Sequence, residues 1–318
     1  MRRRSALVGA AVAGALASGV AAAVLAGRRW RAAEDPCAAT VLDADGGRAF
    51  KVERPDGAVL DGAIFGPEDG PNVVLSHCWT GNRATWEPVA ARLVAAGRRV
   101  VLYDQRGHGA STMGEGDFTV DVLGDDLAAV LEAVDARDAV VAGHSMGGMT
   151  LQALAISRPD VVAARVRAMV LAGTAGFGVA AGVLATPVRL VTGSRSVDRL
   201  MAGRLGPALS RGSVGRRPRQ AHLVATRDAW LSQPGDVRRR FLVGMQAMDY
   251  RAGLAALAVP TTVVVGTRDL LTPPRLGRAL AAAIPGARLV EVPGAGHMLP
   301  FEEPDRLAEI IIAEGDRP

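Results

Sequence analysis

Short apolar runs and longer amphipathic stretches alternate along most of the chain. Runs of four to six apolar residues predict buried strands, and apolar residues three and four positions apart predict helices. A Pro-Asp-Gly turn separates the first two predicted strands, which we expect to pair as a hairpin. Strands are predicted over residues 48–54, 58–65, 73–76, 99–103, 139–142, 168–172, 262–265 and 289–292. Helices are predicted over residues 85–96, 119–134, 149–157, 274–283 and 304–313.

The order of these elements indicates the α/β class. Strand and helix alternate from residue 73 onward, which is typical of a mainly parallel central sheet with helices on both faces. The alternation lapses after residue 173 and returns at residue 259. We therefore expect a core of residues 48–173 and 259–318. Residues 174–258 are expected to form a helical cap over the carboxyl ends of the strands, where such sheets bind ligands.

The N-terminal 31 residues differ from the rest in charge and hydropathy. Three arginines precede residues 5–27, a run of 23 residues without a charge, and three more arginines follow it. A run of this length can cross a bilayer. We expect residues 1–31 to form a membrane anchor of one helix and residues 32–47 to form a linker. The alternative is a signal segment that is cleaved on secretion, and arginines on both flanks leave the orientation of an anchor open.

Charge and composition narrow the range of partners. The net charge of +5 divides into +6 over residues 2–31, +9 over residues 187–251 and −10 over the remainder. A basic cap beside an anchor favours a membrane surface as a partner, although solvated arginines would give the same pattern. Aromatic residues are scarce and no nucleic-acid-binding module occurs, so no nucleic-acid partner is expected. Cys37 and Cys78 lack zinc spacing, and the sequence predicts neither a metal nor another cofactor.

Residues 140–149 combine a strand pattern, a serine between two glycines and the start of a helix pattern. The central residues are Gly143-His144-Ser145-Met146-Gly147. A sharp strand-to-helix turn lifts a serine hydroxyl clear of the sheet, and the glycines remove Cβ atoms that would collide there. The first helical amides point at negative charge that forms beside the hydroxyl. This context predicts a nucleophile elbow with Ser145 as the nucleophile and the Met146 amide as an oxyanion donor, rather than a glycine-rich turn with an incidental serine.

A serine nucleophile needs a base, and the base needs an orienting acid. His297 lies in the loop after the last predicted strand, and Asp269 follows the strand before it. The order Ser145, Asp269, His297 is the one expected for an elbow of this kind. Of the remaining histidines, His77 ends a buried strand and His108 lies in a glycine turn. His144 adjoins the serine, and His222 belongs to the cap.

Other carboxylates are interpreted as structural or solvated. Asp104 is expected to accept hydrogen bonds within its own loop, residues 105–107. Asp125 and Asp126 are expected to be solvated residues of a helix.

Together these motifs resemble those of the α/β-hydrolase superfamily, in its branch of monoacylglycerol-lipase-like and esterase-like serine hydrolases. The resemblance extends from about residue 48 to the end, apart from the cap, and implies the α/β-hydrolase fold. It also assigns the second oxyanion donor to the backbone amide of Trp79. The residue before this donor is usually glycine in the family, and in this chain it is Cys78. The matching segments are His77-Cys78-Trp79, residues 104–111, residues 143–148, Gly266-Thr267-Arg268-Asp269 and Gly294-Ala295-Gly296-His297.

These residues predict a serine hydrolase that cleaves carboxylic esters, with apolar or lipid-like acyl groups, through an acyl-enzyme intermediate. The same three residues can also support cofactor-free perhydrolase or haloperoxidase chemistry, or acyl transfer. Epoxide hydrolases and haloalkane dehalogenases need a carboxylate nucleophile, and position 145 is serine. A non-catalytic binding protein on this fold is the alternative of another class.

Overall fold

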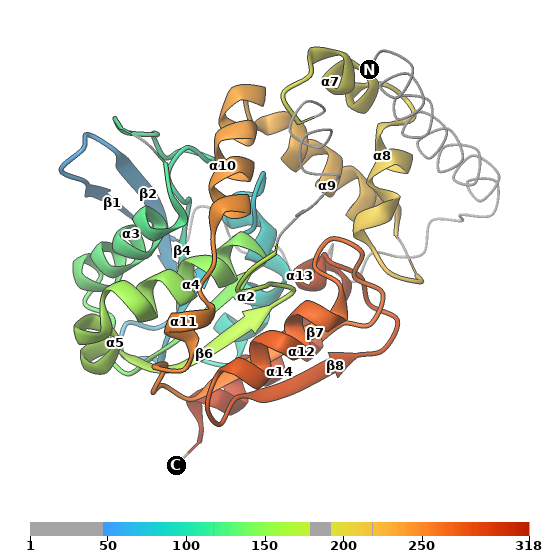
Figure 1. The fold of residues 1–318 in the computed structure, drawn as a ribbon. Coiled ribbons are helices and arrows are strands. Elements are labelled where there is room, and N and C mark those ends of the chain that lie inside the picture. The colour runs from blue at the N-terminus through green and yellow to red at the C-terminus, as the bar shows by residue number, and fades with distance from the viewer. Residues whose placement is uncertain (1–46, 117, 179–191, 218, 318) are drawn as a thin grey trace.

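A computed structural model describes residues 47–317, apart from residues 117, 179–191 and 218. Its eight strands form one sheet in the order β1-β2-β4-β3-β5-β6-β7-β8 (Figure 1). The pairs β1–β2 and β2–β4 are antiparallel, and all other neighbours are parallel. The strands are β1 (Arg48–Glu53), β2 (Val59–Phe65), β3 (Asn72–Ser76), β4 (Arg99–Tyr103), β5 (Ala139–His144), β6 (Val166–Ala172), β7 (Thr261–Gly266) and β8 (Arg288–Val292).

Helices connect the strands and account for the predicted alternation. In the core they are α2 (Glu87–Ala95), α3 (Val120–Ala133), α4 (Met146–Ser157), α5 (Pro159–Arg165), α12 (Pro274–Ala283), α13 (Leu299–Glu302) and α14 (Pro304–Gly315). A short 3-10 turn, η2 (Arg83–Trp86), precedes α2. The predicted mainly parallel sheet with helices is confirmed, and the predicted strands and helices differ from these elements only at their ends.

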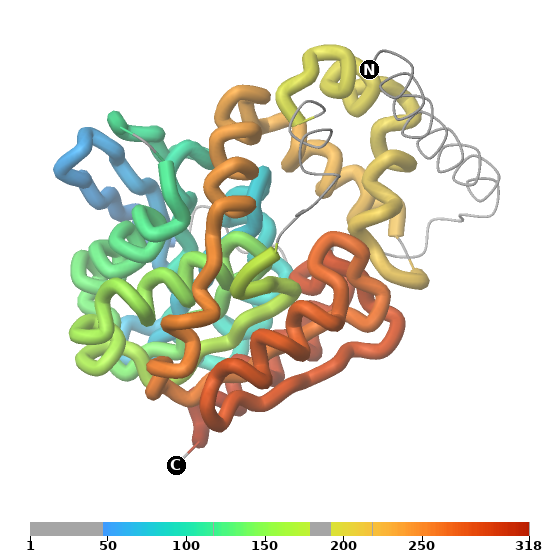
Figure 2. Tube along the Cα trace, in the orientation of Figure 1, coloured from blue at the N-terminus to red at the C-terminus, as the bar shows by residue number. Residues whose placement is uncertain are grey.

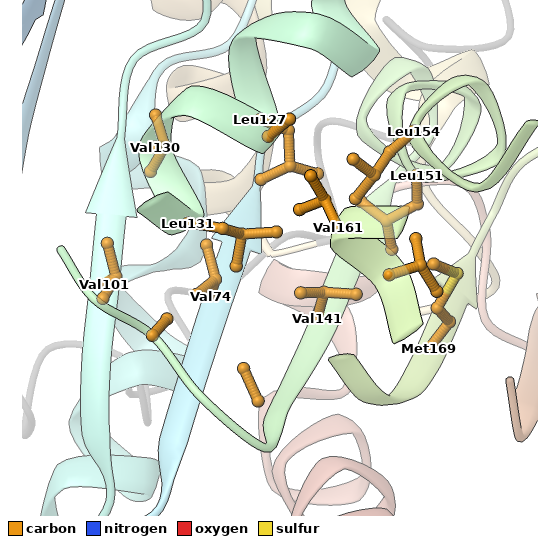
Figure 3. Close-up of a cluster of buried hydrophobic side chains, with 14 of the residues drawn as sticks. Val74, Val101, Leu127, Val130, Leu131, Val141, Leu151, Leu154, Val161 and Met169 are labelled. Atoms are coloured by element: carbon orange, nitrogen blue, oxygen red, sulfur yellow. The ribbon is translucent and has the colours of Figure 1, made fainter. Parts of the chain in front are cut away.

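Successive residues of the buried strands face opposite sides of the sheet, as pleated strands require. Val74 and Val141 pack on one side against Leu127 of α3 and Leu151 of α4 (Figure 3). Their neighbours Val73 and Val140 belong to the cluster on the other side, with residues of α2 and α14. Each fully buried valine or leucine contributes about 1.5–3 kcal/mol. The central strands are therefore held from both faces, which makes their carboxyl ends a firm support for a site.

Two of the carboxylates have different partners from those expected. Asp126 is only 1% exposed and pairs with Arg106 (Nη2–Oδ1 2.7 Å) and with Arg54 (Nε–Oδ1 3.0 Å). The prediction that Asp126 is solvated is wrong, because arginines from β-strand loops distant in sequence reach the helix. Asp104 accepts hydrogen bonds from the amides of Arg83 (2.7 Å) and Ala110 (2.9 Å), not from residues 105–107.

Further helices lie in the insertion, residues 174–258, between β6 and β7 (Figure 2). Arg238 is 1% exposed and organises this region, donating to the carbonyl oxygens of Trp230 (2.7 Å) and Gln233 (2.5 Å) and pairing with Asp198. At least one arginine of the basic insertion is thus a buried structural group. The elements are α7 (Arg195–Ala202), α8 (Gly206–Leu209), η4 (Ser210–Ser213), α9 (Gln220–Ser232), α10 (Gly235–Ala247) and α11 (Arg251–Leu254).

The predicted membrane location is contradicted. Within the described residues, no helix is both long enough and apolar enough to pass through a bilayer. A transmembrane helix needs about 20 residues, whereas α3, the longest helix described, has 14. Residues 1–31, the predicted anchor or signal segment, lie outside the described residues, as do residues 32–46 of the linker predicted over residues 32–47. We therefore withdraw the assignment to a membrane, together with the membrane surface as a partner.

Candidate active site

Ser145 lies at the sharp turn between β5 and α4, with φ of 54° and ψ of −114°. Positive φ is uncommon for a residue with a side chain. A Cβ at Gly143 would lie 2.4 Å from the carbonyl carbon of Gly147, and a Cβ at Gly147 would lie 2.1 Å from the Ser76 oxygen. Only glycine fits at either position. The backbone therefore has the geometry predicted for a nucleophile elbow.

Hydrogen bonds from β6 and the loop after it hold this strained turn. The Ser145 amide donates to the Ala172 oxygen (2.9 Å), and the Thr174 hydroxyl donates to the Ser145 oxygen (2.7 Å). Strained backbone persists where surrounding contacts over-determine it. The position of Ser145 is thus fixed by β6 and the loop after it, and not by its own sequence motif alone.

Asp269 and His297 come from the loops after β7 and β8 and form a buried pair. The Nδ1 of His297 lies 2.8 Å from Oδ2 of Asp269. The amides of Leu271 and Thr272 donate to the other carboxylate oxygen, Oδ1, at 2.8 Å each. Burial acts to raise the pKa of Asp269, but the interaction with His297 and the hydrogen bonds from His297 and Thr272 outweigh it and hold that pKa below its usual value. An ionised Asp269 requires the proton on Nδ1 of His297, which leaves Nε2 as an acceptor.

His144 joins this pair to the elbow. Its Nε2 donates to the His297 carbonyl oxygen at 2.7 Å, and the two rings lie 5.0 Å apart. The hydroxyl of Ser145 makes no hydrogen bond with His297 or with any other residue in the described part of the chain. Catalytic hydrogen bonds are often long before substrate binds. The structure thus brings Asp269 and His297 into contact and places the His297 backbone against the residue that precedes Ser145.

His77 orients the peptide bond that carries the predicted Trp79 donor. The Gln105 amide donates to Nε2 of His77 (2.9 Å), so Nδ1 carries the proton and donates to the Cys78 oxygen (2.8 Å). The described peptide bonds are all trans, so the Cys78 oxygen and the Trp79 N–H point in opposite directions. Gly147 of the elbow lies against the carbonyl oxygens of Ser76 and His77. The loop after β3 and the start of α4 are therefore side by side.

Both predicted oxyanion donors are unused. Neither the Trp79 amide nor the Met146 amide donates to an acceptor among the residues that the structure describes. Cys78, which replaces the usual glycine, is buried with Val214 and Met298, and burial raises the pKa of its thiol to about 11. The cysteine side chain is therefore an uncharged group packed in a buried cluster.

Three other histidines are buried and uncharged. Burial lowers the pKa of His77 to about 4 and the pKa values of His108 and His144 to about 3. Each binds a backbone carbonyl: that of Cys78, Arg106 or His297, respectively. These histidines serve as neutral hydrogen-bonding groups, and His222 lies in α9 of the insertion.

A separate polar cavity lies at the opposite edge of the sheet, near the amino ends of β3 and β5, and is lined in part by Asn72, Arg98 and Val140. Ligands of such sheets bind beyond the carboxyl ends of the strands. The elbow and the Asp269–His297 pair lie at those ends, and the cavity does not contain them.

Residues 71–304 match the family described as alpha/beta hydrolase fold. The chain belongs to the α/β-hydrolase family. RutD of Variovorax paradoxus, provisionally named a carbamate hydrolase, is 29% identical over 74% of this chain and 87% of its own. The 3-oxoadipate enol-lactonase 1 of Acinetobacter baylyi is 27% identical over 83% of this chain and 95% of its own. The structure of a thermophilic esterase from Thermogutta terrifontis is similar with a TM-score of 0.70 and 26% identity, over 84% of this chain and 97% of that one.

Sequence reasoning about this hydrolase missed the groups that hold the site residues. The holding roles of His77 and His144 do not follow from their motifs, since the Gln105 amide that fixes His77 and the His297 oxygen that His144 binds belong to distant segments. Thr272 contacts Asp269 through its hydroxyl, at 2.7 Å, as well as through its amide. A short polar residue three positions after an aspartate is typical of a local side-chain turn, and this signal could have identified Thr272.

Proposed function

We propose that the hydrolase cleaves carboxylic esters, with Ser145, Asp269 and His297 as its catalytic residues. The observation that carries this proposal is the buried 2.8 Å contact between Asp269 and His297, next to a strained serine turn at the same edge of the sheet. An imidazole held in this tautomer can accept a proton from the serine hydroxyl.

The proposed reaction begins with attack of Ser145 Oγ on the ester carbonyl carbon, while Nε2 of His297 takes the hydroxyl proton. The negative charge on the carbonyl oxygen is stabilised by the amides of Trp79 and Met146. The carbon–oxygen bond to the alcohol then breaks, and His297 returns the proton to the leaving oxygen. Water repeats the sequence on the acyl-enzyme, releasing the acid and restoring Ser145.

We propose an apolar acyl group for the substrate. Leu270 and Leu271 directly follow Asp269 and are 71% and 55% exposed. Trp79 lies edge-on to Trp230 of the insertion, with ring centres 5.8 Å apart. Large apolar side chains beside a polar site favour ligands with an apolar part. The names of the relatives, which include an esterase, an enol-lactonase and a carbamate hydrolase, agree with cleavage at an acyl carbon.

We also propose the division into a core of residues 48–173 and 259–318 and a cap of residues 174–258. The position of α7 to α11 between β6 and β7 supports it, because these helices add nothing to the sheet. The edge contact between Trp79 and Trp230 further supports a cap close to the site.

A fluorophosphonate probe tests the proposed nucleophile, because it reacts with activated serines. Wild type should be labelled, and Ser145→Ala should not. Ser157→Ala is the matched control, since Ser157 ends the same helix and only bonds the Ala153 oxygen. Labelling that persists in Ser145→Ala, or is absent from folded wild type, would contradict the assignment.

Initial rates with p-nitrophenyl esters of increasing chain length test the substrate class. We expect kcat/KM to rise by up to about fourfold for each methylene that becomes buried, following the transfer free energy of that group. A flat or falling series would contradict an apolar acyl site. Parallel reactions with hydrogen peroxide or an added alcohol distinguish hydrolysis from perhydrolysis and acyl transfer by their products.

A further inference from the structure

The insertion makes main-chain contacts with the loop that carries His297. The amides of His297 and Met298 both donate to the Ser213 oxygen, at 2.9 and 3.2 Å. The Arg216 amide donates to the Gly294 oxygen at 2.8 Å. Residues 213–216 begin at the last residue of η4, after α8 (Figure 1), and therefore lie directly on residues 294–298. We call these two segments the crossing.

Glycines allow the two segments of the crossing to approach this closely. A Cβ at Gly215 would lie 2.1 Å from the Gly294 oxygen, and a Cβ at Gly296 would lie 2.4 Å from the Gly215 nitrogen. These are backbone atoms and cannot turn aside as a flexible side chain could. A side chain at either position would push the His297 loop and the insertion apart.

Glu302 binds both sides of the crossing with one carboxylate. Its Oε2 accepts from the Gly215 amide at 2.6 Å. The Gly296 amide lies 3.1 Å from Oε1 and 3.0 Å from Oε2, and the Met298 amide donates to Oε1 at 3.1 Å. Hydrogen bonds to an ionised acceptor are about twice as strong as neutral ones. The carboxylate thus holds the residues on either side of His297 and ties both of them to the insertion.

A small apolar cluster reinforces the crossing. Cys78 from the loop before Trp79, Val214 from the insertion and Met298 from the His297 loop are buried together, with Leu223 of α9. The same region thus contacts the segment with the predicted oxyanion donor, the segment with the predicted base and the insertion.

We propose that Glu302 and Gly215 are positioning residues for His297, so that the insertion sets the placement of the imidazole as well as covering the site. The inference rests on the proposed function of His297 as the base. Neither residue touches the reacting atoms, and each acts through the backbone of residues 294–298. A displaced insertion would accordingly displace the base.

If the contacts of Glu302 and Gly215 only stabilised the fold, their loss would lower stability alone. The test therefore needs readouts that report on His297. Among the described residues, the titratable groups that interact with His297 are Asp269, His144 and Glu302. A carboxylate charge nearby favours the protonated imidazole. Removing the charge of Glu302 should therefore move the acidic limb of the kcat/KM profile to lower pH, whereas loss of a remote structural contact should not.

Glu302→Gln is the first variant, because its amide group cannot accept the hydrogen bonds that one of the carboxylate oxygens accepts. We expect about a tenfold lower kcat with KM changed less than twofold, and the acidic limb shifted downward. Glu303→Gln is the matched control, with the same chemical change one residue away; the Glu303 carboxylate makes no hydrogen bond within the described chain. Its kcat and pH profile should match wild type.

Gly215→Ala tests the crossing from the insertion side and should also lower kcat about tenfold. Its control is Gly212→Ala, since a Cβ at Gly212 meets nothing within 4 Å. Thermal melting establishes that each variant is folded. The downfield proton resonance of the His297–Asp269 hydrogen bond should shift in Glu302→Gln and Gly215→Ala but not in the controls.

This resonance separates the two hypotheses. If wild type hydrolyses no ester, the proposed function fails, and the resonance still reports whether the crossing positions His297. Folded Glu302→Gln and Gly215→Ala proteins with the wild-type resonance, and with wild-type kcat where wild type is active, would overturn the positioning role.

Discussion

Replacing Asp269 with asparagine should lower kcat about 10,000-fold while the protein stays folded. The amides of Leu271 and Thr272 both donate to Oδ1 of Asp269, so they will hold the asparagine carbonyl oxygen in that place. The NH₂ group must then take the position of Oδ2, where Nδ1 of His297 now donates. An NH₂ group cannot accept that proton. His297 will adopt the other tautomer, with its proton on Nε2, and can no longer accept one from Ser145.

Asp104→Asn is the matched control for this experiment. Asp104 is also a buried aspartate in a loop after a strand, and it too accepts two backbone amides, those of Arg83 and Ala110. Its replacement should lower the melting temperature and leave kcat of the folded enzyme within a few-fold of wild type. The measurement is the steady-state rate of each variant with one ester, corrected for the fraction of folded protein. Equal losses for the two variants would remove Asp269 from its proposed role.

Mild acid should destabilise the hydrolase strongly, because three histidines are buried in the neutral form. Burial lowers the pKa of His77 to about 4 and those of His108 and His144 to about 3, from the unfolded value of 6.5. Below pH 6.5 the unfolded chain therefore binds protons that the native protein does not, and stability falls as the pH falls. Between pH 7.5 and 5 the loss is about 2 kcal/mol for each histidine. Their sum is comparable to the total stability of many domains, which is about 5–15 kcal/mol.

Urea unfolding measured from pH 7.5 to 5 tests this prediction, with His108→Asn as the companion variant. Nδ1 of His108 donates to the Arg106 oxygen, and an asparagine amide supplies a similar donor without titrating in this range. The substitution will cost stability at every pH, since the ring also packs on Phe241. The informative quantity is the slope of the unfolding free energy against pH, which should fall by about one third. An unchanged slope would show that His108 does not contribute to the acid sensitivity.

The predicted elements depended on local signals, and these were sufficient. Apolar runs such as residues 73–76 and 139–142 form buried strands, because any fold of this class must cover both faces of its central sheet. The turn at Ser145 could also be anticipated, since Gly143 is required by a backbone collision with Gly147 only four residues away. The need for Gly147 itself comes from the distant backbone of Ser76 and His77. Asp269 and His297 were identified from strand order, which places the loops after β7 and β8 at the same edge.

The groups that hold those residues could not be anticipated in the same way. Asp126 is an example. Its place in a predicted helix indicated a solvated carboxylate, but Arg54 and Arg106 from other segments approach this carboxylate and bury it. The predicted membrane location rested on the composition of residues 1–31, and the described helices gave it no support.

Chain order and side-chain periodicity are local properties, and they were enough to predict the sheet, the serine turn and the acid and histidine that follow the last two strands. The bonds of the Gln105 amide to His77, of His144 to the His297 oxygen and of the Gly215 amide to Glu302 became evident only in three dimensions. Each involves a backbone atom, and every residue carries the same backbone donors and acceptors. Their pairing depends on which segments packing brings together, and side-chain identity does not encode it.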